Sequence, residues 1–216
     1  MSLCIPGHNF KRLTCNFALI AIACSLCADC TSSSPPSQRI IVAIDRSEST
    51  DYFRGQQLDA VDYAAASSVL HNSQLDVWCY DTTATEVYTP QVPDRVEVVN
   101  VVKREQMIPD PNHQRCRTRP ADLLEHLISS LDDPAAPKTV KILLLTDGDN
   151  DFFDDPPRIK KDLKAIACQC NAQIAIAGVT PNNVSQWNAW LRPTFGSKYT
   201  VTELPQAADS IHRFLK

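Results

Sequence analysis

Two short, almost entirely apolar segments constrain the fold of this chain more than any other feature. Residues 40–44 read Ile-Ile-Val-Ala-Ile, and residues 140–145 read Val-Lys-Ile-Leu-Leu-Leu. A strand with one face in water alternates apolar and polar residues, whereas a strand covered on both faces is apolar almost throughout. A third run of this kind spans residues 173–177. The sequence therefore predicts strands that are buried inside a domain.

Amphipathic segments separate these strands. Apolar residues recur at helical spacing between residues 58 and 69 and between 123 and 131, and Pro120 precedes the second series where a first helical turn tolerates proline. Strands alternating with helices predict an α/β fold, with a doubly wound, mostly parallel sheet and helices on both faces. The other expected elements are a hairpin of strands 75–80 and 85–89, a strand at 96–102, and helices at 158–167, 183–191 and 206–215.

The first thirty residues differ from the rest of the chain. Lys11 and Arg12 precede an apolar run over residues 13–23, which is shorter than the roughly 20 residues of a membrane span. This order is typical of a secretory signal. Ala21-Ile-Ala-Cys24 also resembles a bacterial lipoprotein signal, with Ala21 where leucine is usual, and the resemblance implies lipid attachment at Cys24. The alternatives are a buried amino-terminal helix or a start codon assigned upstream of the true one.

A polar stretch follows the signal-like segment. Residues 31–38 read Thr-Ser-Ser-Ser-Pro-Pro-Ser-Gln and have the composition of a linker. The expected organisation is a signal at 1–30, a linker at 31–38 and one folded domain at 39–216. We expect export to the cell envelope or periplasm.

The composition excludes several classes of function. The chain has 21 Lys and Arg against 25 Asp and Glu, a net charge of −4, so it lacks the basic excess of a nucleic-acid-binding protein. It has only 5 glycines, and neither GxGxxG nor GxxxxGK[ST] occurs in it. The cysteines of the body do not have the spacing of a structural zinc site.

Oxygen-bearing side chains follow the two strongest strands. Asp45, Ser47 and Ser49 come directly after residues 40–44, and Asp147 follows Thr146 just beyond residues 140–145. Thr118 precedes the helix expected near Pro120. In an α/β sheet, ligands bind at the carboxyl ends of the strands. Carboxylates and hydroxyls are hard ligands that suit Mg²⁺ or Mn²⁺ better than zinc or copper.

This pattern, with Thr118 and the Thr146-Asp147-Gly148 turn, resembles the metal-ion-dependent adhesion site of von Willebrand factor type A domains. The resemblance covers residues 39–216 and implies that family's fold, with strand order 3-2-1-4-5-6. The family usually has Gly-Gly-Thr where this chain has Cys116-Arg117-Thr118.

The resemblance also implies a role for each residue of the site. Ser47 and Ser49 would bind Mg²⁺ or Mn²⁺ through their hydroxyls, while Asp45 and Asp147 would act mainly through bound water. Thr118 would enter or leave the coordination shell with the ligand state. The open coordination position would accept a carboxylate from a protein partner. We therefore expect a metal-dependent adhesion or scaffold module, not an enzyme, with no nucleic acid partner and membrane contact only through the amino terminus.

Two other functions remain open. A phosphohydrolase could use Asp45 as its nucleophile, but the acid normally needed two residues later is replaced here by Ser47. No GxSxG motif for a serine hydrolase occurs. A domain with a purely structural role would keep these residues as helix caps and turns.

Charged, aromatic and cysteine residues outside the predicted metal site could also have a function. Arg115, Arg117 and Arg119 lie around Thr118 and could receive an anionic partner, although pairing with nearby aspartates is slightly favoured. The acidic residues 147–155 are more typical of a solvated loop than of a second cation site. Trp187 and Trp190 are expected in the core. Cys168 and Cys170 could be redox-active or pair with Cys79 or Cys116 in an exported protein.

Overall fold

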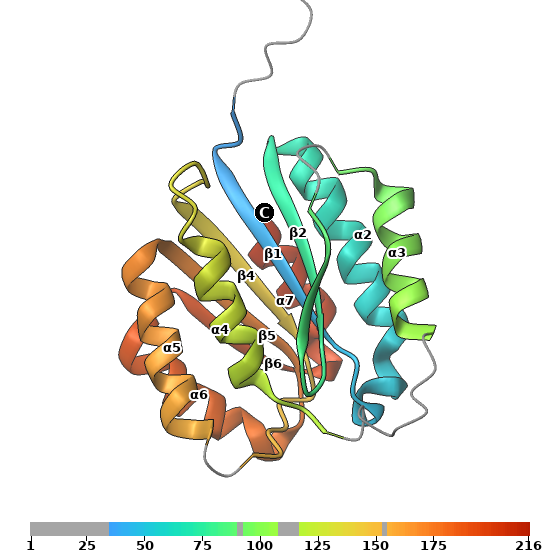
Figure 1. The fold of residues 1–216 in the computed structure, drawn as a ribbon. Helices are drawn as coiled ribbons and strands as arrows, with labels where there is room; N and C mark the ends of the chain where they lie inside the picture. Colours follow the sequence, from blue (N-terminus) through green and yellow to red (C-terminus); the bar gives the residue numbers. More distant parts are fainter. Residues whose placement is uncertain (1–34, 90–92, 108–116, 153–154) are drawn as a thin grey trace, which may run out of the picture. The chain divides into compact units, whose positions relative to one another are not determined.

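A computed structural model describes residues 35–89, 93–107, 117–152 and 155–216 of the chain. The signal-like segment and Cys24 lie outside these residues. Within them, six strands form one sheet in the order β3-β2-β1-β4-β5-β6, which confirms the expected order (Figure 1). The strands are β1 (Gln38–Asp45), β2 (Ser73–Tyr80), β3 (Ala84–Tyr88), β4 (Thr139–Leu145), β5 (Asn171–Val179) and β6 (Tyr199–Glu203).

The first strand lies in the middle of the sheet. β1 is parallel to both β2 and β4, with Asp45 opposite Tyr80 on one side and Ile44 opposite Leu145 on the other. β2 and β3 are antiparallel, which confirms the expected hairpin. β5 and β6 continue the parallel sheet. The strand at β6 falls in a segment for which the apolar pattern predicted none.

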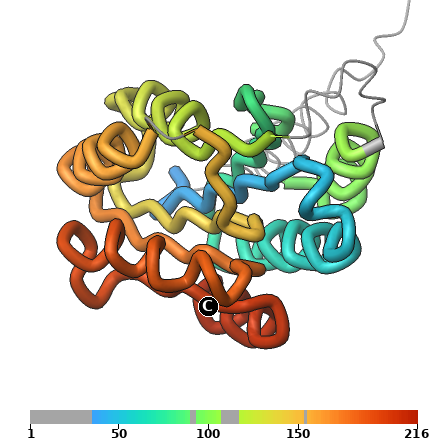
Figure 2. Tube along the Cα trace, turned by 90° about the horizontal axis from the view of Figure 1, so that it is seen from below, coloured from blue at the N-terminus to red at the C-terminus, as the bar shows by residue number. Residues whose placement is uncertain are grey.

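Helices cover both faces of the sheet (Figure 2). One face packs against α2, α3 and α7, and the other against α4, α5 and α6. Residues 40–44 of β1 are completely buried and alternate between the two cores, as a doubly covered strand requires. The helical elements are η1 (Glu48–Phe53), α2 (Arg54–Leu70), α3 (Arg95–Met107), α4 (Pro120–Leu131), α5 (Asp155–Gln169), α6 (Pro181–Phe195) and α7 (Leu204–Leu215).

The prediction of a strand at residues 96–102 is wrong, because this segment belongs to α3. The five valines of the segment favour a strand by intrinsic propensity. Val98 and Val102, however, lie one helical turn apart and are both fully buried in the core shared with α2. The Asp94 carboxylate also accepts hydrogen bonds from the backbone of Val96 (2.8 Å) and Glu97 (3.0 Å), as a helix N-cap does. Packing and capping therefore outweigh the propensity.

No helix in the described part of the chain combines the length and the apolarity needed to span a bilayer. Cys79 is buried in β2, whereas Cys168 is exposed near the end of α5. Cys116, the other cysteine considered as a disulfide partner, lies outside the described residues.

A buried ion pair lies near the amino ends of the central strands. The Arg39 guanidinium contacts the Asp76 carboxylate, and their side chains are 5% and 0% exposed. Arg39 also donates to the carbonyl of Ser130 at 2.9 Å. Asp76 accepts from the Thr89 hydroxyl at 2.7 Å. This network joins β1, β2 and the residue after β3 to the end of α4.

We predict that Asp76→Ala destabilises the protein by about 3–5 kcal/mol, because it leaves the Arg39 charge buried and unpaired. Urea unfolding followed by circular dichroism measures the change. The matched control is Glu125→Ala, which removes a carboxylate that is 59% exposed and paired with Arg158. Equal losses in the two variants would contradict the prediction.

Candidate metal site

The two aspartates of the sequence motif meet at the carboxyl edge of the sheet. Asp45 is the last residue of β1, and Asp147 follows the end of β4 by two residues. Because β1 and β4 are adjacent and parallel, both carboxylates reach the same edge. The strand order changes direction between β1 and β4. This is the position at which open α/β sheets bind ligands.

Asp45 is fully buried and organises the turn that follows it. One carboxylate oxygen accepts a hydrogen bond from the backbone N–H of Ser47 at 2.9 Å, and the other accepts from the Thr146 hydroxyl at 2.8 Å. The hydroxyls of Ser47 and Ser49 lie 3.0 Å apart. The two serines are thereby held beside the carboxylate of the motif's first residue.

Asp147 completes this group of four residues. It is only 2% exposed, and it accepts hydrogen bonds from the Ser49 hydroxyl and, at 3.1 Å, from the backbone N–H of Asp149. Burial raises the pKa of Asp147, and the charges of Asp149 and Asp151 raise it further. Two hydroxyls and two carboxylates, all from the predicted set, therefore lie together.

The carboxylates of Asp45 and Asp147 lack a positively charged partner. Burial raises the pKa of Asp45 to about 7, and the nearby charge of Asp147 contributes to the rise. Among the described residues, no lysine or arginine forms an ion pair with either carboxylate. Nor does that part of the chain hold any cluster of three or more His, Cys, Asp or Glu side chains suited to a metal. The set present consists of two carboxylates with hydroxyls, a donor set that suits a hard cation.

Thr118 lies at the same edge, on the segment before α4. It is 1% exposed. Its N–H donates to the Asp151 carboxylate at 2.5 Å, and its carbonyl accepts from the backbone of Asp151 at 3.1 Å. The N–H of Arg119 donates to the carbonyl of Asp81, just beyond β2, at 2.8 Å. The backbone thus fixes Thr118 between the end of β2 and the loop after β4.

The two described arginines beside Thr118 both lie over the Phe152 ring, with the Arg119 guanidinium 4.6 Å from its centre. Arg119 forms two hydrogen bonds with the Asp155 carboxylate, at 2.9 and 3.1 Å, which confirms the favoured pairing with an aspartate. The guanidinium of Arg117 lies 5.9 Å from the centre of the Phe152 ring. Of the acidic residues expected in a solvated loop, Asp149 and Asp151 are exposed, whereas the expectation is wrong for Asp147 and Asp155, which are buried. Residues 115 and 154 lie outside the described part of the chain.

A buried glutamine outside the predicted set lies beneath the site. Gln57 in α2 is 1% exposed, and its amide donates to the carbonyls of Asp45 at 3.0 Å and Leu145 at 3.4 Å. Its own carbonyl accepts from the amide of Gln106 in α3 at 2.9 Å. Gln57 therefore ties together the ends of β1 and β4. The only available signal was a polar residue beside the apolar stripe of a helix, which does not identify a partner.

A second residue outside the predicted set lies at the surface of the site. Tyr52 in η1 is 59% exposed. Partial burial raises the pKa of its hydroxyl, and the charges of Asp147, Asp149 and Asp45 raise it further, so the ring lies within their electrostatic reach. An exposed tyrosine beside such a site is well suited to contact a partner.

Gly148 allows the turn that presents Asp147. Its φ is +86°, and an added Cβ would lie 2.8 Å from Val179 Cγ1 and 2.9 Å from the indole nitrogen of Trp187. That nitrogen donates to the Gly148 carbonyl at 3.0 Å. Trp187 is fully buried, which confirms the expectation that it belongs to the core.

We predict that Gly148→Ala destabilises the protein by about 2–5 kcal/mol, since it combines a left-handed backbone with overpacking against Val179 and Trp187. Thermal unfolding measures the loss. Gly55→Ala is the control, because an added Cβ at that helical position meets nothing within 4 Å. A Gly148→Ala variant as stable as the control would show that the loop can adopt another conformation at little cost.

Solved structures of other proteins share this architecture. No protein-family model and no curated protein sequence matches the chain. Solved structures do, and their shared class is the von Willebrand factor type A fold. The domain of that name from Catenulispora acidiphila superposes with a TM-score of 0.60 at 18% identity, over 83% of this chain and 42% of that one.

Two further structures have the same arrangement. BatB from Bacteroides thetaiotaomicron gives a TM-score of 0.58 at 13% identity, over 82% of this chain and 96% of that one. Proximal thread matrix protein 1 from the mussel byssus gives 0.60 at 16% identity, over 83% of this chain and 47% of that one. This chain thus spans about half the length of the mussel protein. At these identities the likeness defines the fold, and the chain has the fold of a von Willebrand factor type A domain.

Proposed function

We propose that this chain is a metal-dependent protein-binding module whose cation lies at the carboxyl edge of the sheet. The observation that supports the proposal is the pair of buried carboxylates, Asp45 and Asp147, grouped with two serine hydroxyls. Burial raises the pKa of both carboxyls, the nearby charge of Asp147 raises that of Asp45 further, and a bound divalent cation would offset the cost of their charge. The same edge of the sheet holds Thr118.

The donor set fits Mg²⁺ or Mn²⁺. Ser47 and Ser49 would coordinate directly, with Asp45 and Asp147 oriented by the hydrogen bonds already described. A shell rich in neutral hydroxyls leaves more positive charge on the cation than a shell of carboxylates does. An acidic side chain of a partner would therefore gain more by binding there. The exposed Tyr52, whose pKa is raised by partial burial and by the charges of Asp147, Asp149 and Asp45, would contact the same partner.

The other two functions have less support. A phosphohydrolase would need an acid where Ser47 stands, and the Ser47 hydroxyl is engaged with Ser49 at 3.0 Å. A purely structural domain would use these side chains only as turn and cap groups. It would then show no response to divalent cations, so one experiment separates it from the proposal.

We predict that Mn²⁺ or Mg²⁺ stabilises the full chain against thermal unfolding relative to EDTA. A ligand that binds only the native state adds about 2.7 kcal/mol at a hundredfold excess over its Kd. Ser49→Ala should abolish the response, and because Ser49 is exposed the variant should still fold. Asp45→Ala should abolish it as well, with some loss of stability of its own.

Ser129→Ala, at an exposed position in α4, is the matched control and should keep the response. An unresponsive wild-type protein would favour the structural function. A response that persists in both Ser49→Ala and Asp45→Ala would place the cation elsewhere. Once metal binding is established, peptides with a single glutamate and matched peptides with glutamine test the partner chemistry: only the former should bind, and EDTA should release them.

We further propose that the protein is exported and anchored at the cell envelope through Cys24. The basic residues, the apolar run and the small residues before Cys24 support this proposal. One structure of similar fold, at 12% identity, is described as an aerotolerance-related membrane protein from Bacteroides fragilis.

Cys24→Ser should move the protein from the membrane fraction to the soluble fraction of a bacterial host, whereas Cys27→Ser should not. Fractionation and mass spectrometry of the amino terminus measure the change. Identical partitioning of the two variants would refute a lipid anchor at Cys24.

A further inference from the structure

The amino edge of the sheet, where the parallel strands begin, is also where the chain enters the domain. Gln38 is the first residue of β1, and its side chain donates to the hydroxyl of Ser73, the first residue of β2, at 3.2 Å. One residue earlier, the backbone N–H of Ser37 donates to the carbonyl of Asn72 at 3.4 Å. Asn72 belongs to the turn that follows α2. The chain therefore enters the domain beside the last turn of α2.

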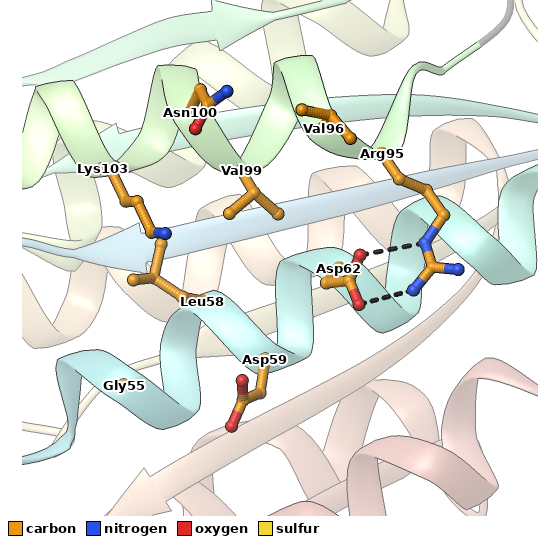
Figure 3. Close-up of a pocket in the computed structure, with 9 residues that line it drawn as sticks. All are labelled: Gly55, Leu58, Asp59, Asp62, Arg95, Val96, Val99, Asn100 and Lys103. Carbon is orange, nitrogen blue, oxygen red and sulfur yellow. Dashed lines mark hydrogen bonds and ion pairs between the residues drawn. The ribbon is translucent and has the colours of Figure 1, made fainter.

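Exposed apolar side chains are concentrated toward the same edge. Large apolar side chains with high exposure number four in the described part of the chain, and two of them, Val69 (56%) and Leu70 (78%), end α2. A third, Val96, is 71% exposed at the start of α3. α2 and α3 run in opposite directions and line a groove, with Gly55 at one end and Val96 at the other (Figure 3). β1 points toward the Gly55 end, so Val96 lies toward the amino edge.

The two edges of the sheet differ in charge. In their described residues, the loops after β1 and β4 hold no exposed Lys or Arg but four exposed acids, Glu48, Asp51, Asp149 and Asp151. The loops before β4 and β6 hold as many exposed lysines as exposed acids: Lys138 and Lys198, Asp132 and Asp133. An anionic surface therefore repels the carboxyl edge more strongly than the amino edge.

The anchor proposed at Cys24 would keep the amino edge close to a bilayer. Ser37 follows Cys24 by thirteen positions, and a chain of that length spans at most about 45 Å. A tether makes docking an intramolecular event, so a patch too small to hold a protein on a bilayer from solution becomes sufficient. Val69 and Leu70 form such a patch.

We propose that the amino edge of the domain docks on a lipid bilayer through Val69 and Leu70, with the metal site directed away from the lipid. The inference rests on the anchor proposed at Cys24. The two apolar side chains would enter the boundary between headgroups and acyl chains. Lys138 and Lys198 would extend to lipid phosphates. The carboxyl edge, at the other end of β1, is then presented to a protein partner.

The experiment measures how strongly brominated lipids quench a tryptophan placed at each edge of the full chain. The protein is isolated from bacterial membranes and reconstituted into vesicles that contain phosphatidylglycerol, with EDTA present so that the result is independent of the metal site. Leu70→Trp places the probe at the amino edge, and Tyr52→Trp places it beyond β1 at the carboxyl edge. The three native tryptophans are at most 6% exposed and give the same background in both variants.

Leu70→Trp should be quenched at least about twice as strongly as Tyr52→Trp, because a docked side chain reaches the acyl boundary. Adding Val69→Glu to Leu70→Trp should lower the quenching, since it places a charge in the apolar patch. Adding Lys138→Glu should lower it too, because the amino edge then becomes acidic. Lys160→Glu, the same charge change at an exposed position of α5, is the control and should leave the quenching unchanged.

Mass spectrometry of the amino-terminal peptide of the same samples reports the anchor separately. Equal quenching of the two probes in a chain that carries lipid on Cys24 would overturn the docking and leave the anchor in place. Quenching of Leu70→Trp that Val69→Glu does not lower would also overturn it. A chain without lipid on Cys24 would overturn the anchor and the docking together.

Discussion

The parallel pairing of β1 with two neighbours, under helices on both faces, is the constraint on which the rest of the structure depends. Every side chain from Ile40 to Ile44 is excluded from water, so the strand is fixed in register on both sides and its end is fixed in space. Asp45, the last residue of this strand, is therefore fully buried. A buried carboxylate needs hydrogen bonds or a counter-charge. The donors that follow in the chain, Ser47 and Thr146, supply the hydrogen bonds.

The site is consequently built before any ligand arrives. Asp45, Ser47, Ser49 and Asp147 are held by hydrogen bonds to one another, and Gln57 holds the ends of their strands from below. Such a group has little conformational freedom left to lose, which favours binding. The charge of Asp147 still disfavours ionisation of Asp45, and a bound cation would reduce this repulsion. Trp187 in α6 fixes the second half of the group through its hydrogen bond to the Gly148 carbonyl.

The parts of this structure that the sequence predicts are those with a strong period or a strong local rule. Buried strands, the hairpin and the motif at the ends of β1 and β4 fall in this class. The failures have physical causes. The valines of α3 favour a strand, and only their burial against α2 shows otherwise. Residues of β6 are mostly half-buried, so the strand lacks a continuous apolar run. Gln57 acts through backbone carbonyls that lie 12 and 88 residues away in sequence, and no local pattern encodes such a contact.

The position of Gln57, two residues after Gly55, has a thermodynamic consequence. On its outer side, the first turn of α2 lines the groove between α2 and α3 with Gly55. On its inner side, Gln57 donates hydrogen bonds to the carbonyls of Asp45 and Leu145. Gln106, on the last turn of α3, completes the connection between the two helices. A contact that stabilises this turn from outside would therefore also stabilise the ends of β1 and β4. By linkage, stabilising the strand ends would in turn strengthen that outer contact by the same free energy.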